Sequence, residues 1–211
     1  IRRVDTKELQ IKRDFAAGNA IVNLQFGIDR PDPLGDDGIH IVNACLTKGC
    51  PWLTTLWLSD NAISHIGAQV LGEGLARHES VTDISLSNNP IRSDGLQALC
   101  AALGGSECPL TKLDVSTCQI LRLPFEMVDL DNLKIVVMED NNILFPSREV
   151  LSRGITAIFE FLEERRNLQD ASTPARSDPS RGTTPNLKTS TSGRRMLLPE
   201  PSGNHPLDAM G

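Results

Sequence analysis

The stretch LTTLWLSDNAI at residues 53–63 decides the fold, because its aliphatic residues have a fixed spacing and an asparagine closes the pattern. Alternate residues of a strand point to opposite faces, so Leu56 and Leu58 are predicted to be buried together. Trp57 lies between them and is predicted to face outward. Asn61 follows where the chain is expected to turn away from the strand.

The same frame recurs along the chain without gaps. Further copies are VTDISLSNNPI from residue 81, LTKLDVSTCQI from residue 110 and LKIVVMEDNNI from residue 133. A weaker copy, IVNLQFGID, begins at residue 21 and aligns Ile21, Leu24 and Phe26 with the first three aliphatic positions. Repetition at this period indicates stacked supersecondary units that share one continuous core.

These segments resemble the leucine-rich repeat family, whose motif is LxxLxLxxN/CxL, and the resemblance covers about residues 21–145. It implies an α/β fold, namely a solenoid with a curved parallel sheet on the concave face and helices on the convex face. It also implies a ladder in which the ninth-position side chains satisfy backbone groups of neighbouring turns. The ladder residues are Asn61, Asn89, Cys118 and Asn141, with Asp29 as an imperfect member.

The segments between the strands predict two kinds of repeat. Those before Trp52 and after Ile63 and Ile91 carry a glycine followed by apolar residues at three- and four-residue intervals, which indicates helices with one buried stripe. Asp36, Ser93 and Asp94 are candidate N-cap or first-turn residues. These long units resemble ribonuclease-inhibitor repeats. The unit that begins at residue 110 is shorter and resembles the tighter repeats of ordinary intracellular members, so a change of curvature is expected there.

The two ends of the chain have different character. Residues 146–166 predict a helix that covers the open edge of the last repeat, beginning at Pro146. Residues 1–20 are interpreted as a cap or as the end of a preceding repeat. Residues 167–211 are rich in Ser, Thr and Pro, and such a composition predicts a disordered tail because it buries too little apolar surface. Thr173 and Thr184, each followed by proline, are candidate phosphorylation sites.

Charge and composition restrict the class of ligand and compartment. The 211 residues carry a formal net charge of −6, with the acidic excess before residue 167. An acidic body argues against nucleic acid and anionic membrane as main ligands. No apolar run suggests a membrane span, and the five cysteines lack metal-ligand spacing, so a cytoplasmic protein with reduced thiols is expected. The chain begins with Ile, which leaves a trimmed, a processed and a fragmentary chain all open.

Catalytic chemistry is not predicted. The four histidines, His40, His65, His78 and His205, have no positioned nucleophile, and GxGxxG, phosphate-loop and GxSxG motifs are missing from the sequence. Adjacent carboxylates at Asp36–Asp37 and Glu139–Asp140 are interpreted as solvated. We therefore expect a non-enzymatic chain with no catalytic residues, no cofactor and no metal site.

The outward side chains of the strands are the candidate binding surface for a partner protein. They form a contiguous, mildly acidic ribbon in which Trp57 is the candidate anchor, because tryptophan is enriched among residues that dominate binding energy. The alternative is that Gln25 or another first-repeat side chain covers Trp57. The predicted partner-binding residues are Thr55, Trp57, Ser59, Asp60, Asp83, Ser85, Ser87, Asn88, Lys112, Asp114, Ser116, Val137 and Glu139.

The resemblance implies a protein-protein interaction scaffold. A subunit of a large assembly such as a ciliary axoneme and a part of a multidomain signalling protein are both compatible with it, which extends the expected location to the cytoskeleton or cilium. The alternative is a GTPase activator that resembles the Ran GTPase-activating proteins. Those proteins typically carry a strongly acidic C-terminal stretch, whereas residues 167–211 here hold more basic than acidic residues.

Overall fold

The computed structural model describes residues 6–24, 33–48 and 50–172. In this part of the chain, short strands alternate with helices. The elements are α1 (Thr6–Ala16), β1 (Ile21–Asn23), α2 (Gly35–Leu46), β2 (Thr55–Trp57), α3 (His65–Leu75), β3 (Asp83–Ser85), α4 (Arg92–Leu103), β4 (Lys112–Asp114), the 3-10 helix η1 (Phe125–Asp129), β5 (Ile135–Val137), α5 (Arg148–Leu151) and α6 (Ile155–Ser172).

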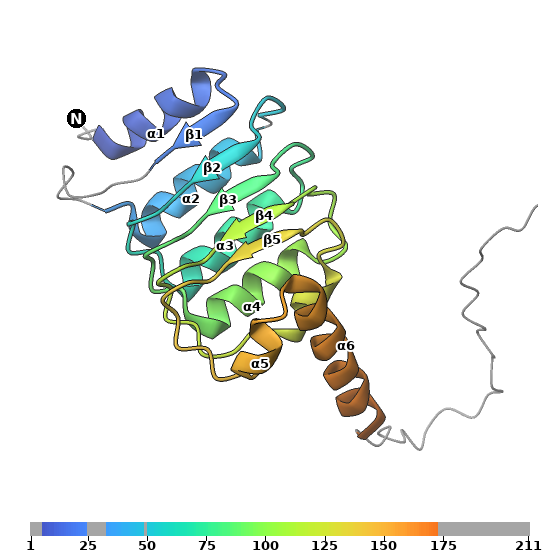
Figure 1. The fold of residues 1–211 in the computed structure, drawn as a ribbon. Helices are drawn as coiled ribbons and strands as arrows, with labels where there is room; N and C mark the ends of the chain where they lie inside the picture. Colours follow the sequence, from blue (N-terminus) through green and yellow to red (C-terminus); the bar gives the residue numbers. More distant parts are fainter. Residues whose placement is uncertain (1–5, 25–32, 49, 173–211) are drawn as a thin grey trace, which may run out of the picture. The chain divides into compact units, whose positions relative to one another are not determined.

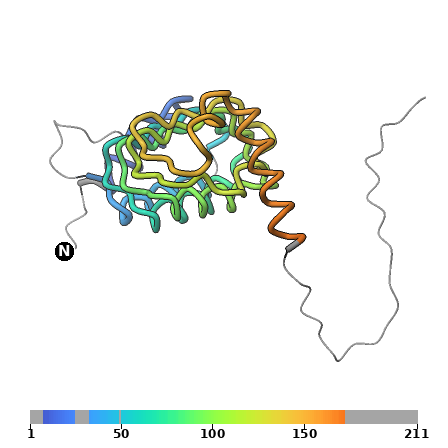
Figure 2. The backbone as a smooth tube through the Cα atoms, turned by 60° about the horizontal axis from the view of Figure 1, so that its bottom comes forward, coloured from blue at the N-terminus to red at the C-terminus, as the bar shows by residue number. Residues whose placement is uncertain are grey.

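The five strands form one parallel sheet in the order β1-β2-β3-β4-β5, so neighbours in sequence are neighbours in space (Figure 1). The register pairs Leu56 with Ile84, Ile84 with Leu113 and Leu113 with Val136. Helices α2, α3 and α4 cover one face of this sheet, and Figure 2 shows the repeats stacked as successive coils. The predicted α/β repeat solenoid is confirmed.

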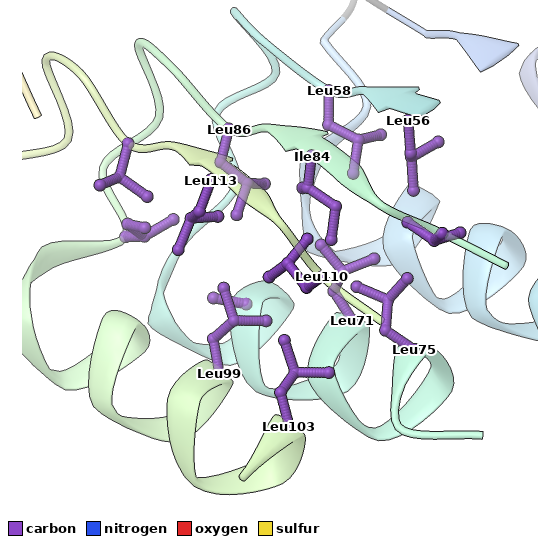
Figure 3. Packing of buried hydrophobic residues seen from close by; sticks show 14 of the residues in the cluster. Leu56, Leu58, Leu71, Leu75, Ile84, Leu86, Leu99, Leu103, Leu110 and Leu113 are labelled. Atoms are coloured by element: carbon purple, nitrogen blue, oxygen red, sulfur yellow. The ribbon is translucent and has the colours of Figure 1, made fainter. Parts of the chain in front are cut away.

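The core lies between the sheet and the helices. Leu56, Leu58 and Leu113 are fully buried and point from the strands toward Leu71 and Leu99 on the helices (Figure 3). Helices α3 and α4 pack directly against each other. A Cβ atom added at Gly95 would lie 2.9 Å from the Cα atom of His65, so glycine is required for this close approach.

The first strand is in a different frame from the one predicted. Val22 pairs with Leu56, and Leu24 is buried in the place that Leu58 has in the next repeat. Ile21 therefore faces outward and is 50% exposed, whereas the sequence alignment placed it in the core. The frame is wrong by two residues. Leu24 faces inward in both frames, because a shift of two preserves the alternation of faces, so the alternation alone does not distinguish them. Phe26, and Asp29 as a ladder residue, lie outside the described residues.

The predicted side-chain ladder is confirmed at Asn61, Asn89 and Asn141, and in part at Cys118. The Oδ1 atom of Asn89 accepts hydrogen bonds from the N–H groups of Asn61 and Ile63, both at 3.0 Å. Asn141 Oδ1 accepts from the N–H groups of Cys118 and Ile120, both at 2.9 Å. The amide nitrogens of Asn61, Asn89 and Asn141 donate to carbonyls of their own and the preceding turn.

Cys118 fills its ladder position only in part. Its thiol donates to the carbonyl of Leu86 at 3.1 Å, as an amide would. A thiol is a weak acceptor, however, and the N–H of Ile91 donates to the carbonyl of Asn89 instead of to residue 118. The Cys118 side chain therefore makes fewer strong hydrogen bonds to the preceding repeat than a ladder asparagine does, while its carbonyl still accepts from the N–H group of Arg92 at 3.0 Å.

The polar residues at the helix starts reach across repeats. The Asp36 carboxylate accepts from the backbone N–H groups of Ser64 at 2.8 Å and Gly67 at 3.1 Å, at the beginning of α3 rather than of its own helix α2. The hydroxyl of Ser93 accepts from the N–H groups of Leu121 and Arg122, both at 3.0 Å. The expected acceptors are thus present, but both serve the following repeat.

The C-terminal region forms two helices where one was predicted over 146–166. Helices α5 and α6 are separated at Gly154, whose φ of 91° is open mainly to glycine. Ile158 and Leu162 of α6 are buried in the core, and Arg166 binds the carboxylate of Asp129 in η1 at 2.8 and 2.9 Å.

Helix α6 continues to Ser172, beyond the predicted helix end at 166. The added residues are compatible with a helix, and Pro174, which disfavours helix at the residue before it, comes just after. The rest of the predicted tail lies outside the described residues. In the described part of the chain, no helix combines the length and apolar character needed to cross a membrane.

Candidate protein-binding face

The strand face is the side of the sheet that points away from the helices. We define it by the outward residues of β1–β5 and of the turn that follows each strand. The register aligns them in three rows, which are Ile21, Thr55, Asp83, Lys112 and Ile135; Asn23, Trp57, Ser85, Asp114 and Val137; and, in the turns, Ser59, Ser87, Ser116 and Glu139. Neighbouring strands in a sheet lie about 4.8 Å apart, so each row is a continuous line of side chains.

Trp57 is the large aromatic side chain of this surface. It is 41% exposed, and the neighbouring strand β1 presents Ile21, which is 50% exposed. Both line a shallow groove of about 470 Å³ together with Asp83 and Lys112. Gln25, the residue that the sequence offered as a cover for Trp57, lies outside the described residues.

Ile21 is the functional candidate that sequence reasoning missed. It was assigned to the core because the first repeat was read two residues out of frame. Ile135 on β5 occupies the same row and is 51% exposed. The row therefore has an aliphatic side chain at each end and polar residues between them. A β-branched aliphatic next to Trp57 adds apolar area that the sequence pattern did not assign to this face.

The serines of the strand face bind one another. Ser87 Oγ donates to Ser59 Oγ at 2.8 Å, and Ser59 Oγ lies 3.0 Å from Ser85 Oγ. Ser85 Oγ then donates to the Asp114 carboxylate at 3.1 Å, and Ser116 Oγ donates to the same carboxylate at 2.8 Å. This chain of hydrogen bonds joins three repeats and holds the floor of the groove in one arrangement.

The network changes the role of one predicted residue. Ser59 is only 7% exposed, so it supports the groove from beneath rather than offering its hydroxyl to a partner. Trp57, Asp83 and Lys112 remain accessible above it. The structure thus places Ser59 beneath the surface that the larger side chains present.

Asp60 and Asn88 occupy the turn just beyond the strands. Asn88 Nδ2 donates to Asp60 Oδ1, and both residues have left-handed backbone conformations, with φ of 60° and 56°. Short polar side chains tolerate this conformation better than branched ones. The two residues are therefore fixed as a pair by the turn, at the edge of the predicted surface.

The charge of the predicted surface is mainly negative. Asp60, Asp83, Asp114 and Glu139 contribute carboxylates, against the single ammonium group of Lys112. Val137 and Glu139 lie at the β5 end, next to Asp114 and Thr117 across the ladder. Ten of the thirteen predicted residues therefore lie on the strand face, with Ser59 beneath it and Asp60 and Asn88 at its edge. Trp57 lies toward the N-terminal end, and the carboxylates are spread along the face.

Other chemically reactive arrangements are not found in the described ranges. No group of three or more His, Cys, Asp or Glu side chains there has a geometry that would hold a metal ion. All five cysteines are free thiols and buried. Burial raises the pKa of Cys108 and of Cys118 to about 11 each, so both thiols stay protonated and weakly nucleophilic near neutral pH.

Comparison with known proteins agrees with the repeat architecture. A family model described as Leucine Rich repeat matches residues 49–72 and 77–100. The chain is 28% identical over 151 residues to ribonuclease inhibitor of Sus scrofa, covering 69% of this chain and 33% of the relative. It is 30% identical over 153 residues to NACHT, LRR and PYD domains-containing protein 13 of Homo sapiens, covering 70% of this chain and 14% of the relative. The chain thus spans a third or less of these relatives.

Two solved structures share the fold. The leiomodin-1 actin-binding site 2 superposes with a TM-score of 0.55 at 12% identity, covering 80% of this chain and 95% of that one. The tropomodulin C-terminal domain of Caenorhabditis elegans gives 0.53 at 15% identity, covering 80% and 98%. At such identities the likeness concerns the arrangement of strands and helices.

Proposed function

Because this chain is a leucine-rich repeat protein, we propose that it is a non-enzymatic scaffold that binds a partner protein through its strand face. The observation that carries the proposal is Trp57, a 41% exposed aromatic beside a groove whose floor is held by inter-repeat hydrogen bonds. A rigid surface loses little conformational entropy on binding, and an aromatic anchor supplies large apolar area.

The chemistry of the face favours a particular kind of partner. Trp57 and Ile21 provide an apolar contact, and Asp83 and Asp114 place carboxylates on the neighbouring strands. We infer a partner segment with an apolar side chain for Trp57 and a basic side chain for the carboxylates. Electrostatic complementarity of this kind accelerates association and disfavours acidic partners.

The test is affinity capture from cell lysate with wild-type protein and matched variants, with the captured proteins identified by mass spectrometry. Trp57→Ala and Asp83→Lys are expected to lose the same set of partners. Trp52→Ala is the control, because Trp52 is 42% exposed but lies outside the strand face, in the turn before β2. Asp131→Lys, at an exposed turn, controls for the charge change.

Two outcomes would remove the proposal. If Trp57→Ala and Trp52→Ala recover the same proteins in equal amounts, the binding surface is not the strand face. If partner loss follows Asp131→Lys as strongly as Asp83→Lys, the effect is one of net charge alone. One of the structures with this fold is an actin-binding site of leiomodin-1, so cosedimentation with actin filaments is a direct first assay of a cytoskeletal partner.

A further inference from the structure

The main-chain hydrogen bonds between repeats stop at the outer edge of β5. In the repeats before it, the N–H groups that follow each strand donate to the next repeat, as Leu86 does to Asp114 at 2.8 Å and Val115 does to Val137 at 2.8 Å. Met138 is the equivalent residue after β5. Its N–H group, and that of Asp140, have no acceptor among the residues that the structure describes.

A second pair of donors is left at the same edge. In two earlier repeats, two N–H groups converge on the Oδ1 atom of one ladder asparagine, as Cys118 and Ile120 do on Asn141. The equivalent N–H groups in the last repeat belong to Asn141 and Ile143. Within the described ranges neither finds an acceptor. The edge therefore presents four N–H donors whose equivalents in earlier repeats have partners. Two of these donors, those of Asn141 and Ile143, correspond to the pair that shares one asparagine oxygen in those repeats.

An open groove of about 530 Å³ lies beside these donors, between the edge of β5 and helices α5 and α6. Val136, Met138 and Ile143 line it and are only partly buried. The residues at the same positions one repeat earlier, Leu113, Val115 and Ile120, are fully buried. The helices that follow β5 thus leave the last layer of core side chains partly open. Leu151, Ile155 and Ile158 form the opposite apolar wall.

We propose that this groove binds an extended segment of a partner protein, which adds to β5 as a sixth parallel strand. Strand addition to an exposed edge supplies main-chain acceptors for Met138 and Asp140, and alternate side chains enter the apolar groove. An Asn or Asp side chain of the segment supplies the oxygen that Asn141 and Ile143 share. Exposed Glu139 and Asp140 at the rim select a segment with a basic residue nearby.

The spacing required of the partner can be read from the chain itself. In the segment VTDISLSNNPIR, residues 81–92, Ile84 and Leu86 fill the core and Asn89 accepts the two N–H groups of the preceding repeat. The proposed partner sequence therefore has two aliphatic residues separated by one, and an asparagine or aspartate three residues after the second. This surface is distinct from the Trp57 groove on the strand face.

The test uses the whole 211-residue chain and a synthetic peptide of sequence VTDISLSNNPIR as the probe. We expect saturable amide chemical-shift changes with a Kd below about 1 mM, and slower hydrogen exchange at Met138, Asp140, Asn141 and Ile143. The same peptide with Asn89→Ala loses the shared acceptor, so its affinity is expected to fall at least about ten-fold.

Two protein variants check the location. Met138→Pro removes an edge donor, a change that edge strands tolerate, and is expected to abolish binding of the peptide. Asp140→Asn keeps a residue suited to the left-handed φ of 53° and is expected to weaken binding about two- to five-fold at low salt. Trp57→Ala is expected to bind the peptide as wild type does, which separates this site from the proposed strand-face function.

Several results would overturn the proposal. These are no binding of the peptide at millimolar concentration, equal affinity for the two peptides, or shifts confined to the strand face. Protection of the β5 edge that grows with protein concentration and without peptide would identify a second copy of the chain as the occupant instead.

Discussion

Replacement of Asn89 by alanine is expected to weaken the solenoid at its centre. The Asn89 Oδ1 atom accepts from Asn61 and Ile63 at 3.0 Å, and its Nδ2 atom donates to Leu58 and Leu86 at 2.9 and 2.8 Å. Alanine leaves two buried backbone N–H groups without an acceptor. Each such group costs about 1–3 kcal/mol, so the free energy of unfolding is expected to fall by about 2–6 kcal/mol. Domains are stable by only about 5–15 kcal/mol in total.

Urea denaturation followed by tryptophan fluorescence and circular dichroism measures this loss. With a slope of about 2 kcal/mol per molar urea, the midpoint is expected to decrease by about 1–3 M. Asn89→Cys copies the residue that occupies position 118, retains a donor and is expected to be intermediate. Asn142→Ala is the control at an exposed asparagine. A loss for Asn89→Ala below about 1 kcal/mol, or equal to that of Asn142→Ala, would refute the reasoning.

Three further predictions address packing, pH and the surface. Gly95→Ala is expected to lower the melting temperature by several degrees, because its Cβ atom would meet the His65 backbone at 2.9 Å; an unchanged value would contradict this close packing. Burial lowers the pKa of His78 below its usual 6.5, so the unfolded chain takes up its proton first and stability is lost as pH falls below about 6.5. Urea midpoints should show this slope, at most about 1.4 kcal/mol per pH unit, and His78→Gln should remove it. Arg166→Ala breaks the exposed pair with Asp129 and is expected to cost less than about 1 kcal/mol in the same titration, while a larger loss would mean that α6 depends on this contact.

The sequence predicted the buried face of β2–β5 because each copy repeats the same alternation of aliphatic residues. It also predicted the ladder, since Asn89 and its equivalents recur at one position of that frame. It failed on β1, where the residues fit two frames that differ by two positions. Both frames bury Leu24, but only the observed one buries Val22 and turns Ile21 outward. Only pairing with the neighbouring strand distinguishes the two frames.

The sequence also did not predict which polar side chains form hydrogen bonds to a neighbouring repeat. Asp36 was assigned to the first turn of its own helix, yet its carboxylate binds the start of α3 in the next repeat. Ser59 was assigned to the presenting surface, yet it lies beneath it because Ser87 and Ser85 hold its hydroxyl. Local patterns specify which residue types are polar or apolar, whereas the stacking of repeats determines which partner each polar atom finds.

The thiol at position 118 leaves one junction of the stack short of a side-chain acceptor. In a linear array, stability is the sum of the units and their junctions, so one side chain at a junction changes the stability of the whole array. Between the turns that carry β3 and β4, Cys118 supplies a donor to Leu86 but no strong acceptor, while the main-chain bonds of that junction, such as Arg92 N–H to the Cys118 carbonyl at 3.0 Å, are retained. Cys118→Asn should therefore restore the asparagine acceptor and raise the urea midpoint of the whole chain.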